Sequence, residues 1–276
     1  MKKGLVIALV AVGSTLLVTG GVVFAVGLAT SNQNSNVITK EHEVASFSKV
    51  NIDVSVSDLY FKISEDASSK VVCAETEKVY HTVEVKDDTL CINGYDSRQW
   101  FERTFDWFWK PLSVTIYLPN GALDEVKIVS STGDINIPES YSMNNLDISL
   151  STGNVSVISN VTENVHIKSS TGDIHFQANA KNIHLEASTG KVKLSNSMSE
   201  KLKIKTSTGD ITVRNSDASS SIDIEASTGD VDAEFLSSKE FDVHASTGSV
   251  RVPSSVSGAT PCRIHTSTGD IKVTIK

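Results

Sequence analysis

The sequence predicts an all-β protein: a single-stranded β-solenoid with rungs of about 19 residues, preceded by one transmembrane helix. Three observations support this fold class. Ser-Thr-Gly recurs eight times after residue 130, apolar and polar residues alternate around each copy, and residues 5–29 carry no charge. A fixed period of this length indicates stacked repeats. The repeated glycines are Gly133, Gly153, Gly172, Gly190, Gly209, Gly229, Gly248 and Gly269.

Each copy has apolar residues at the same four positions relative to its glycine. In the first copy these are Val126, Ile128, Ile135 and Ile137, with polar residues between them. Alternation with period two is typical of half-buried strands. We therefore predict two short strands around each Ser-Thr-Gly corner, with glycine supplying a positive φ at the bend. Eight such units over residues 121–276 would stack around one core, and we expect the solenoid to be right-handed.

Residues 43–120 alternate less regularly and are expected to form irregular opening rungs of the same extracellular domain, which spans residues 43–276. The chain ends inside the strand-like run DIKVTIK. We therefore expect an open sheet edge at the C-terminus, blunted by Lys272 and Lys276, through which a homo-oligomer could form.

Residues 5–29 are long enough to span a bilayer as a helix. Lys2 and Lys3 lie on the amino side, so residues 1–4 are expected to be a cytoplasmic stub and the rest to lie outside the cytoplasm. Residues 30–42 read as a polar linker. The membrane is thus the first predicted partner, and the protein is expected in the cell membrane as a single-pass chain. Cleavage after Gly27-Leu28-Ala29 stays open as an alternative.

The net charge of −8 argues against binding to nucleic acid. The chain has three cysteines, too few for a disulfide scaffold. Cys262 falls on an inward position and is expected to be buried. Cys73 and Cys91 are about one repeat apart, so a disulfide between facing rungs is one alternative for them.

The repeat offers only weak candidates for chemistry. His166 and His184 share one column and His244 and His265 another, so each pair could bind a metal or respond to acid, but no third ligand is evident. Aspartates follow five of the eight glycines and suit turns better than calcium, since a glycine-rich nine-residue repeat is absent. We predict no cofactor, no resident metal and no catalytic residue; a glycan-active enzyme is the least favoured alternative.

The strongest departure from the repeat is the aromatic segment, residues 95–109. It is either a lid packed on an open end of the solenoid or an exposed patch for the membrane or a protein partner. Its interaction candidates are Trp100, Phe101, Phe105, Trp107, Phe108 and Trp109.

The STGDI and STGDV segments, preceded by SVTIYLPNGALDEVKIVSSTGDINI behind one predicted anchor, resemble the bacterial putative-adhesin family of β-strand-repeat cell-envelope domains. The resemblance covers residues 43–276. It implies a domain of largely unknown function for which adhesion is inferred from architecture, and it links some relatives to envelope stress and antimicrobial-peptide responses. We therefore predict a non-enzymatic, membrane-anchored extracellular module that binds cell-wall polymer or an envelope protein, with a stress-response component as the alternative.

Overall fold

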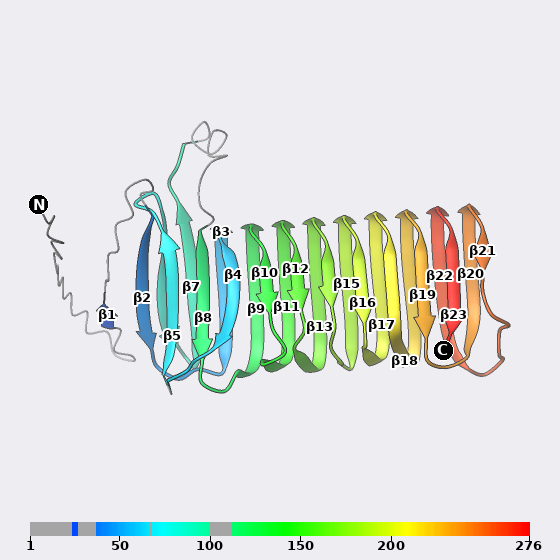
Figure 1. The fold of residues 1–276 in the computed structure, drawn as a ribbon, viewed down its shortest axis with the longest axis horizontal. Helices are drawn as coiled ribbons and strands as arrows, with labels where there is room; N and C mark the ends of the chain where they lie inside the picture. Colours follow the sequence, from blue (N-terminus) through cyan, green and yellow to red (C-terminus); the bar gives the residue numbers. More distant parts are fainter. Residues whose placement is uncertain (1–23, 27–36, 67, 100–111) are drawn as a thin grey trace, which may run out of the picture.

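The computed structural model describes residues 24–26, 37–66, 68–99 and 112–276 as an elongated stack of β-strands (Figure 1). Every regular element among these residues is a strand. No helix in these ranges is long and apolar enough to cross a membrane. Most of the predicted anchor, residues 5–29, lies outside the described residues, and the three described ones form β1 (Phe24–Val26).

The opening part of the stack contains seven further strands. They are β2 (Ile38–Val44), β3 (Lys49–Val56), β4 (Asp58–Ile63), β5 (Ser69–Glu75), β6 (Val79–Lys86), β7 (Thr89–Asp96) and β8 (Ser113–Leu118). β3 and β4 form a rung that pairs in parallel with the first repeat, and β7 and β8 form the next rung outward. β6 pairs antiparallel with β7, and β5 pairs antiparallel with β2 and β8. The opening rungs thus combine parallel and antiparallel pairing.

Each repeat contributes one strand to each of two sheets. The strands of the repeats are β9 (Ala122–Thr132), β10 (Ile135–Ile137), β11 (Ser142–Thr152), β12 (Val155–Val157), β13 (Asn160–Thr171), β14 (Ile174–Phe176), β15 (Asn182–Thr189), β16 (Val192–Ser195), β17 (Met198–Thr208), β18 (Ile211–Thr228), β19 (Val231–Phe235), β20 (Lys239–Thr247), β21 (Val250–Arg251), β22 (Thr260–Thr268) and β23 (Ile271–Ile275). The strand before each glycine lies in the sheet that we call sheet B, and the strand after it lies in sheet A. β18 turns the corner between the sheets.

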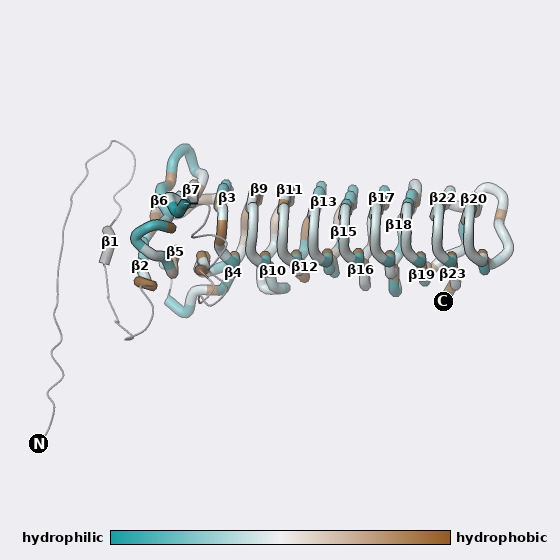
Figure 2. Tube along the Cα trace, turned by 90° about the horizontal axis from the view of Figure 1, so that it is seen from above, coloured by the Kyte–Doolittle hydropathy of each residue, from teal (hydrophilic) through white to brown (hydrophobic). Residues whose placement is uncertain are grey.

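Equivalent residues of successive repeats pair directly, which confirms the predicted columns. Ile128 pairs with Ile148, which pairs with Ile167, and all three are buried. Figure 2 shows the rungs side by side along the long axis. The fold is therefore a solenoid with one continuous apolar core between two parallel sheets.

The last two repeats do not stack in sequence order, so the final strand is not the edge strand that the sequence predicted. β22 pairs with β18 on one side and β20 on the other, and β23 lies between β19 and β21. The final repeat is thus inserted between the sixth and seventh (Figure 1). The outer rung is β20 and β21, where Val250 and Val252 are exposed although their column is buried in earlier rungs. The strand that contains Lys272 is an inner one.

Candidate binding surface

The Ser-Thr-Gly corners are structural. The eight glycines have φ between 131° and 147°, as predicted for the bend. The structure adds a second reason: a Cβ atom at Gly172 would lie 1.9 Å from the carbonyl oxygen of Gly153 on the next rung. Neither requirement involves a ligand, because the backbones of neighbouring rungs meet here.

The aspartates after the glycines form hydrogen bonds along the same corner. The Asp134 carboxylate accepts from the backbone N–H of Asn154 at 2.8 Å, and Asp173 accepts from Lys191 N–H at 2.8 Å. Asp210 accepts a hydrogen bond from the backbone N–H of Asp230 and forms an ion pair with Lys191. These two contacts keep the pKa of Asp210 below its usual value. Each carboxylate therefore holds the next rung in register.

Charged side chains on the outer face of sheet B also pair with one another along the repeats. Lys205 and Glu225 lie 3.3 Å apart, and Arg263 forms two hydrogen bonds with Asp223. The predicted histidine neighbours do stack: the ring centroids are 5.0 Å apart for His166 and His184, and 5.5 Å apart for His244 and His265. His166 also forms a hydrogen bond with Asp147, with 3.1 Å between Nδ1 and Oδ1. Among the described residues, neither pair belongs to a group of three or more metal-ligating side chains.

The suggested disulfide between Cys73 and Cys91 is wrong. Cys73 lies on β5 in sheet A, whereas Cys91 lies on β7 in sheet B, and all three cysteines are free. Cys73 and Cys91 are about one repeat apart in the sequence, but β5 runs antiparallel to its neighbour β8, so this spacing does not place the two residues on facing rungs. Burial raises the pKa of the Cys73 and Cys262 thiols to about 12.

The aromatic segment is attached where other rungs have their Ser-Thr-Gly corner. It connects β7 in sheet B to β8 in sheet A, the same crossing that glycine makes in the repeats. At its start, Arg98 forms two 2.9 Å hydrogen bonds with the Asp96 carboxylate. The six interaction candidates, Trp100 to Trp109, lie outside the described residues.

A tyrosine pair that the sequence analysis missed lies beside this attachment point, on the outer face of sheet B. Tyr80 on β6 is paired with Tyr95 on β7, and their rings stack with centroids 5.2 Å apart and planes at 16°. The two residues are 38% and 47% exposed. The Asp87-Asp88 turn could have revealed the pair, because counting back along both strands from this tight turn brings residues 80 and 95 opposite each other.

Three polar residues form the next row beside the tyrosines. Asn93 lies between Thr82 and Asp53 across three neighbouring strands. We call these five residues the tyrosine patch: Asp53, Tyr80, Thr82, Asn93 and Tyr95. In the described part of the chain, none of their side chains forms a hydrogen bond or ion pair with another residue. The patch thus combines exposed aromatic rings with uncommitted polar groups.

The two-sheet stack of Ser-Thr-Gly rungs defines a β-solenoid repeat protein without a recognisable catalytic motif in its repeats. The chain belongs to the family described as Toastrack DUF4097, whose model matches residues 47–274. This agrees with the resemblance drawn from the STGD segments.

A solved structure shares the architecture at low sequence identity. This putative adhesin from Bacteroides fragilis is 19% identical with a TM-score of 0.59, and the match covers 90% of this chain and 100% of that one. The similarity extends to the fold alone. A protein from Parabacteroides distasonis described as a putative lipid binding protein also matches, at 16% identity with a TM-score of 0.43, covering 88% and 93%. No curated protein matches the chain in sequence.

Proposed function

We propose that this protein is a non-enzymatic binding module that attaches to a cell-wall polymer or surface glycan through the tyrosine patch. The observation that carries this proposal is the exposed, stacked Tyr80–Tyr95 pair beside uncommitted polar side chains. Tyrosine is enriched at binding surfaces because its ring supplies contact area and its hydroxyl can form hydrogen bonds. A flat pair of rings flanked by Thr, Asn and Asp suits a ligand with apolar faces and many hydroxyl groups.

The proposal includes the location expected from the sequence. Residues 5–29 would anchor the chain in the cell membrane, and the solenoid would lie outside the cytoplasm, where a wall polymer is within reach. The repeats would act as a spacer in this role, since outward charged groups such as Lys205 and Glu225 pair with one another along the stack.

The test is a binding measurement with the full-length chain in a mild detergent. Wild-type protein should bind isolated cell-wall polysaccharide in a sedimentation or calorimetry assay. Tyr95→Ala should weaken binding about tenfold or more, the loss that exposed aromatic anchors often show. Tyr117→Ala is the matched control, because this ring on sheet A contacts Lys70 and lies away from the patch.

Two results would count against the proposal. Absence of wild-type binding to wall polymers would remove its basis, and equal losses for Tyr95→Ala and Tyr117→Ala would show that the patch is not the site. Release of new reducing ends from the polymer would instead indicate a glycan-active enzyme.

A further inference from the structure

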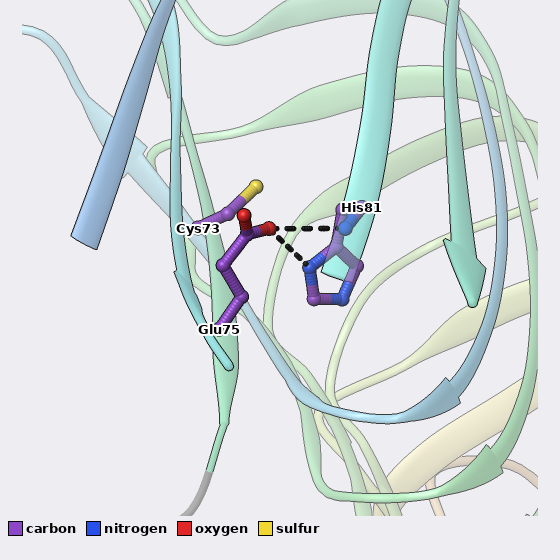
Figure 3. Close-up of side chains that lie close together, drawn as sticks. All are labelled: Cys73, Glu75 and His81. Atoms are coloured by element: carbon purple, nitrogen blue, oxygen red, sulfur yellow. Dashed lines mark hydrogen bonds and ion pairs between the residues drawn. The ribbon is translucent and has the colours of Figure 1, made fainter. Parts of the chain in front are cut away.

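Three side chains that metals commonly bind meet inside the N-terminal end of the solenoid. Cys73 and Glu75 point inward from β5, and His81 points inward from β6 (Figure 3). All three are buried, and one ligand atom from each lies within 4.8 Å of the others. The group lies in the core, apart from the tyrosine patch on the outer face.

Hydrogen bonding to Ser57 fixes the orientation of the His81 ring. The Ser57 hydroxyl lies 2.6 Å from the carbonyl oxygen of Val56 and 2.9 Å from His81 Nε2. This contact leaves Nδ1 as the ring nitrogen that faces Glu75.

The other ring nitrogen of His81 faces a carboxylate. His81 Nδ1 lies 3.4 Å from Glu75 Oε2, which also accepts the backbone N–H of His81 at 3.0 Å. Two ligands on a tetrahedral zinc ion, with bonds of about 2.0–2.1 Å, lie about 3.3 Å apart. The spacing of these two atoms therefore fits two ligands of one zinc ion.

The burial of Ser57 argues against a Ser-His-Glu catalytic triad. Ser57 is 2% exposed. A serine nucleophile needs access for a substrate.

Lys40 balances the charge of the site without a metal. Its ammonium group contacts Glu75 Oε1, and its side chain is 44% exposed, so it can swing into solvent. Without a metal, Glu75 is thus paired with Lys40 and with the backbone N–H of His81.

We propose that Cys73, Glu75 and His81 bind a Zn²⁺ ion that replaces the Lys40 ammonium. The Cys73 thiol loses its proton to solvent, its sulfur bonds to the metal, and the thiolate and carboxylate together neutralise the dication. Sulfur, imidazole and carboxylate ligands are the set that zinc prefers, and Ser57 holds the imidazole as an outer-shell partner.

His42 lies near the cluster but is not one of the three residues whose ligand atoms lie within 4.8 Å of one another. It lies on β2, two residues from Lys40 and on the same side of the sheet, because Lys40 pairs with Cys73 and His42 pairs with Val71. Its Nε2 atom is buried without a hydrogen-bond partner. A shift of the His42 side chain toward the metal would give this nitrogen a partner and would tie β2, β5 and β6 together.

The test uses the full-length chain, treated with a chelator and titrated with Co²⁺ and then Zn²⁺. Co²⁺ should produce the charge-transfer band of a cobalt–thiolate bond at one equivalent, and Zn²⁺ should displace it. Cys73→Ser should abolish the band. Cys262→Ser is the matched control, since Cys262 is equally buried at the other end of the stack; this variant should keep the band.

Lys40→Met keeps the test decisive if ligand variants fold poorly. Removal of the competing ammonium should tighten Zn²⁺ binding, by about tenfold on the scale of outer-shell changes, and misfolding cannot produce such a gain. Three results would overturn the proposal: no thiolate band in the wild type, a band that survives in Cys73→Ser, or Zn²⁺ binding that is lost on His166→Gln instead.

Discussion

The regular rungs and the irregular ends of this solenoid satisfy their polar groups in different ways. In the rungs, a polar side chain bonds to the same column of the next rung, as Asp173 does with the N–H of Lys191. At the ends, charged groups turn inward. The buried Asp, Glu, Lys and His residues in the described chain are Glu75, His81, Asp217 and Lys239. Glu75 and His81 lie on the antiparallel strands of the N-terminal end, and Lys239 lies on the outer C-terminal rung, where it pairs with Asp217 of β18.

This difference follows from stacking. A rung with equivalent neighbours on both sides can pair each column in register, so no charged group needs to enter the core. At an end the neighbour is missing, and strands such as β5 and β6 close the stack in another direction. Chemistry that needs unlike groups at one point is therefore expected at the ends.

The largest expected effect comes from a corner glycine of a regular rung. Gly172→Ala should lower the free energy of unfolding by more than about 4 kcal/mol or prevent folding, because the new Cβ meets the Gly153 carbonyl and φ is 131°. Urea denaturation followed by circular dichroism measures this loss.

Gly258→Ala is the control from the irregular C-terminal loop. Its φ is 80°, but no atom lies within 4 Å of the new Cβ, so only the backbone cost of about 1–2 kcal/mol is expected. Equal losses for the two variants would show that rung-to-rung contact does not require the glycines.

A buried ion pair at the C-terminal end should give the next largest effect. Lys239 contacts Asp217, and its ammonium donates to Ser237 Oγ at 2.6 Å. Lys239→Ala leaves the Asp217 carboxylate buried and unpaired, so a loss of about 3–5 kcal/mol is expected in the same assay. Lys168→Ala, which breaks an exposed pair with Glu186 on a regular rung, should cost at most about 1 kcal/mol. A small loss for Lys239→Ala would mean that water reaches this end.

The regular rungs could be predicted from the sequence because every copy repeats the same columns. Residues such as Ile128 and Ile148 are identical in type and offset, so alternation alone placed them in the core. Their order at the C-terminal end could not be predicted, since the seventh and eighth repeats carry equivalent columns and either can pair with the sixth. The loop after Arg251, where Val256 N–H donates to Lys239, covers part of the outer edge.

The groups at the N-terminal end were only partly predictable. Alternation places Cys73 and Glu75 on one face of β5 and His81 on the inward face of β6. The three side chains converge because β5 and β6 pair antiparallel with their neighbours at the end of a parallel stack. The pattern of the repeats does not predict that pairing. The rings of Tyr80 and Tyr95 meet for the same reason.

The smallest expected effect concerns the histidine ladder on the regular rungs. Burial, and then the neighbouring His166 and Lys203, lower the pKa of His184 below its ordinary value of 6.5. The unfolded chain therefore binds a proton at a higher pH than the folded chain does. Stability that His184 contributes above pH 6.5 is lost as the pH falls from that value through the folded pKa.

Thermal unfolding at pH 7.5 and 5.5 should show this loss in the wild type, and His184→Gln should reduce the difference between the two pH values. An NMR titration of the imidazole provides the direct measurement. A His184 pKa above 6.5 would contradict the prediction and would mean that the ladder accepts two adjacent positive charges.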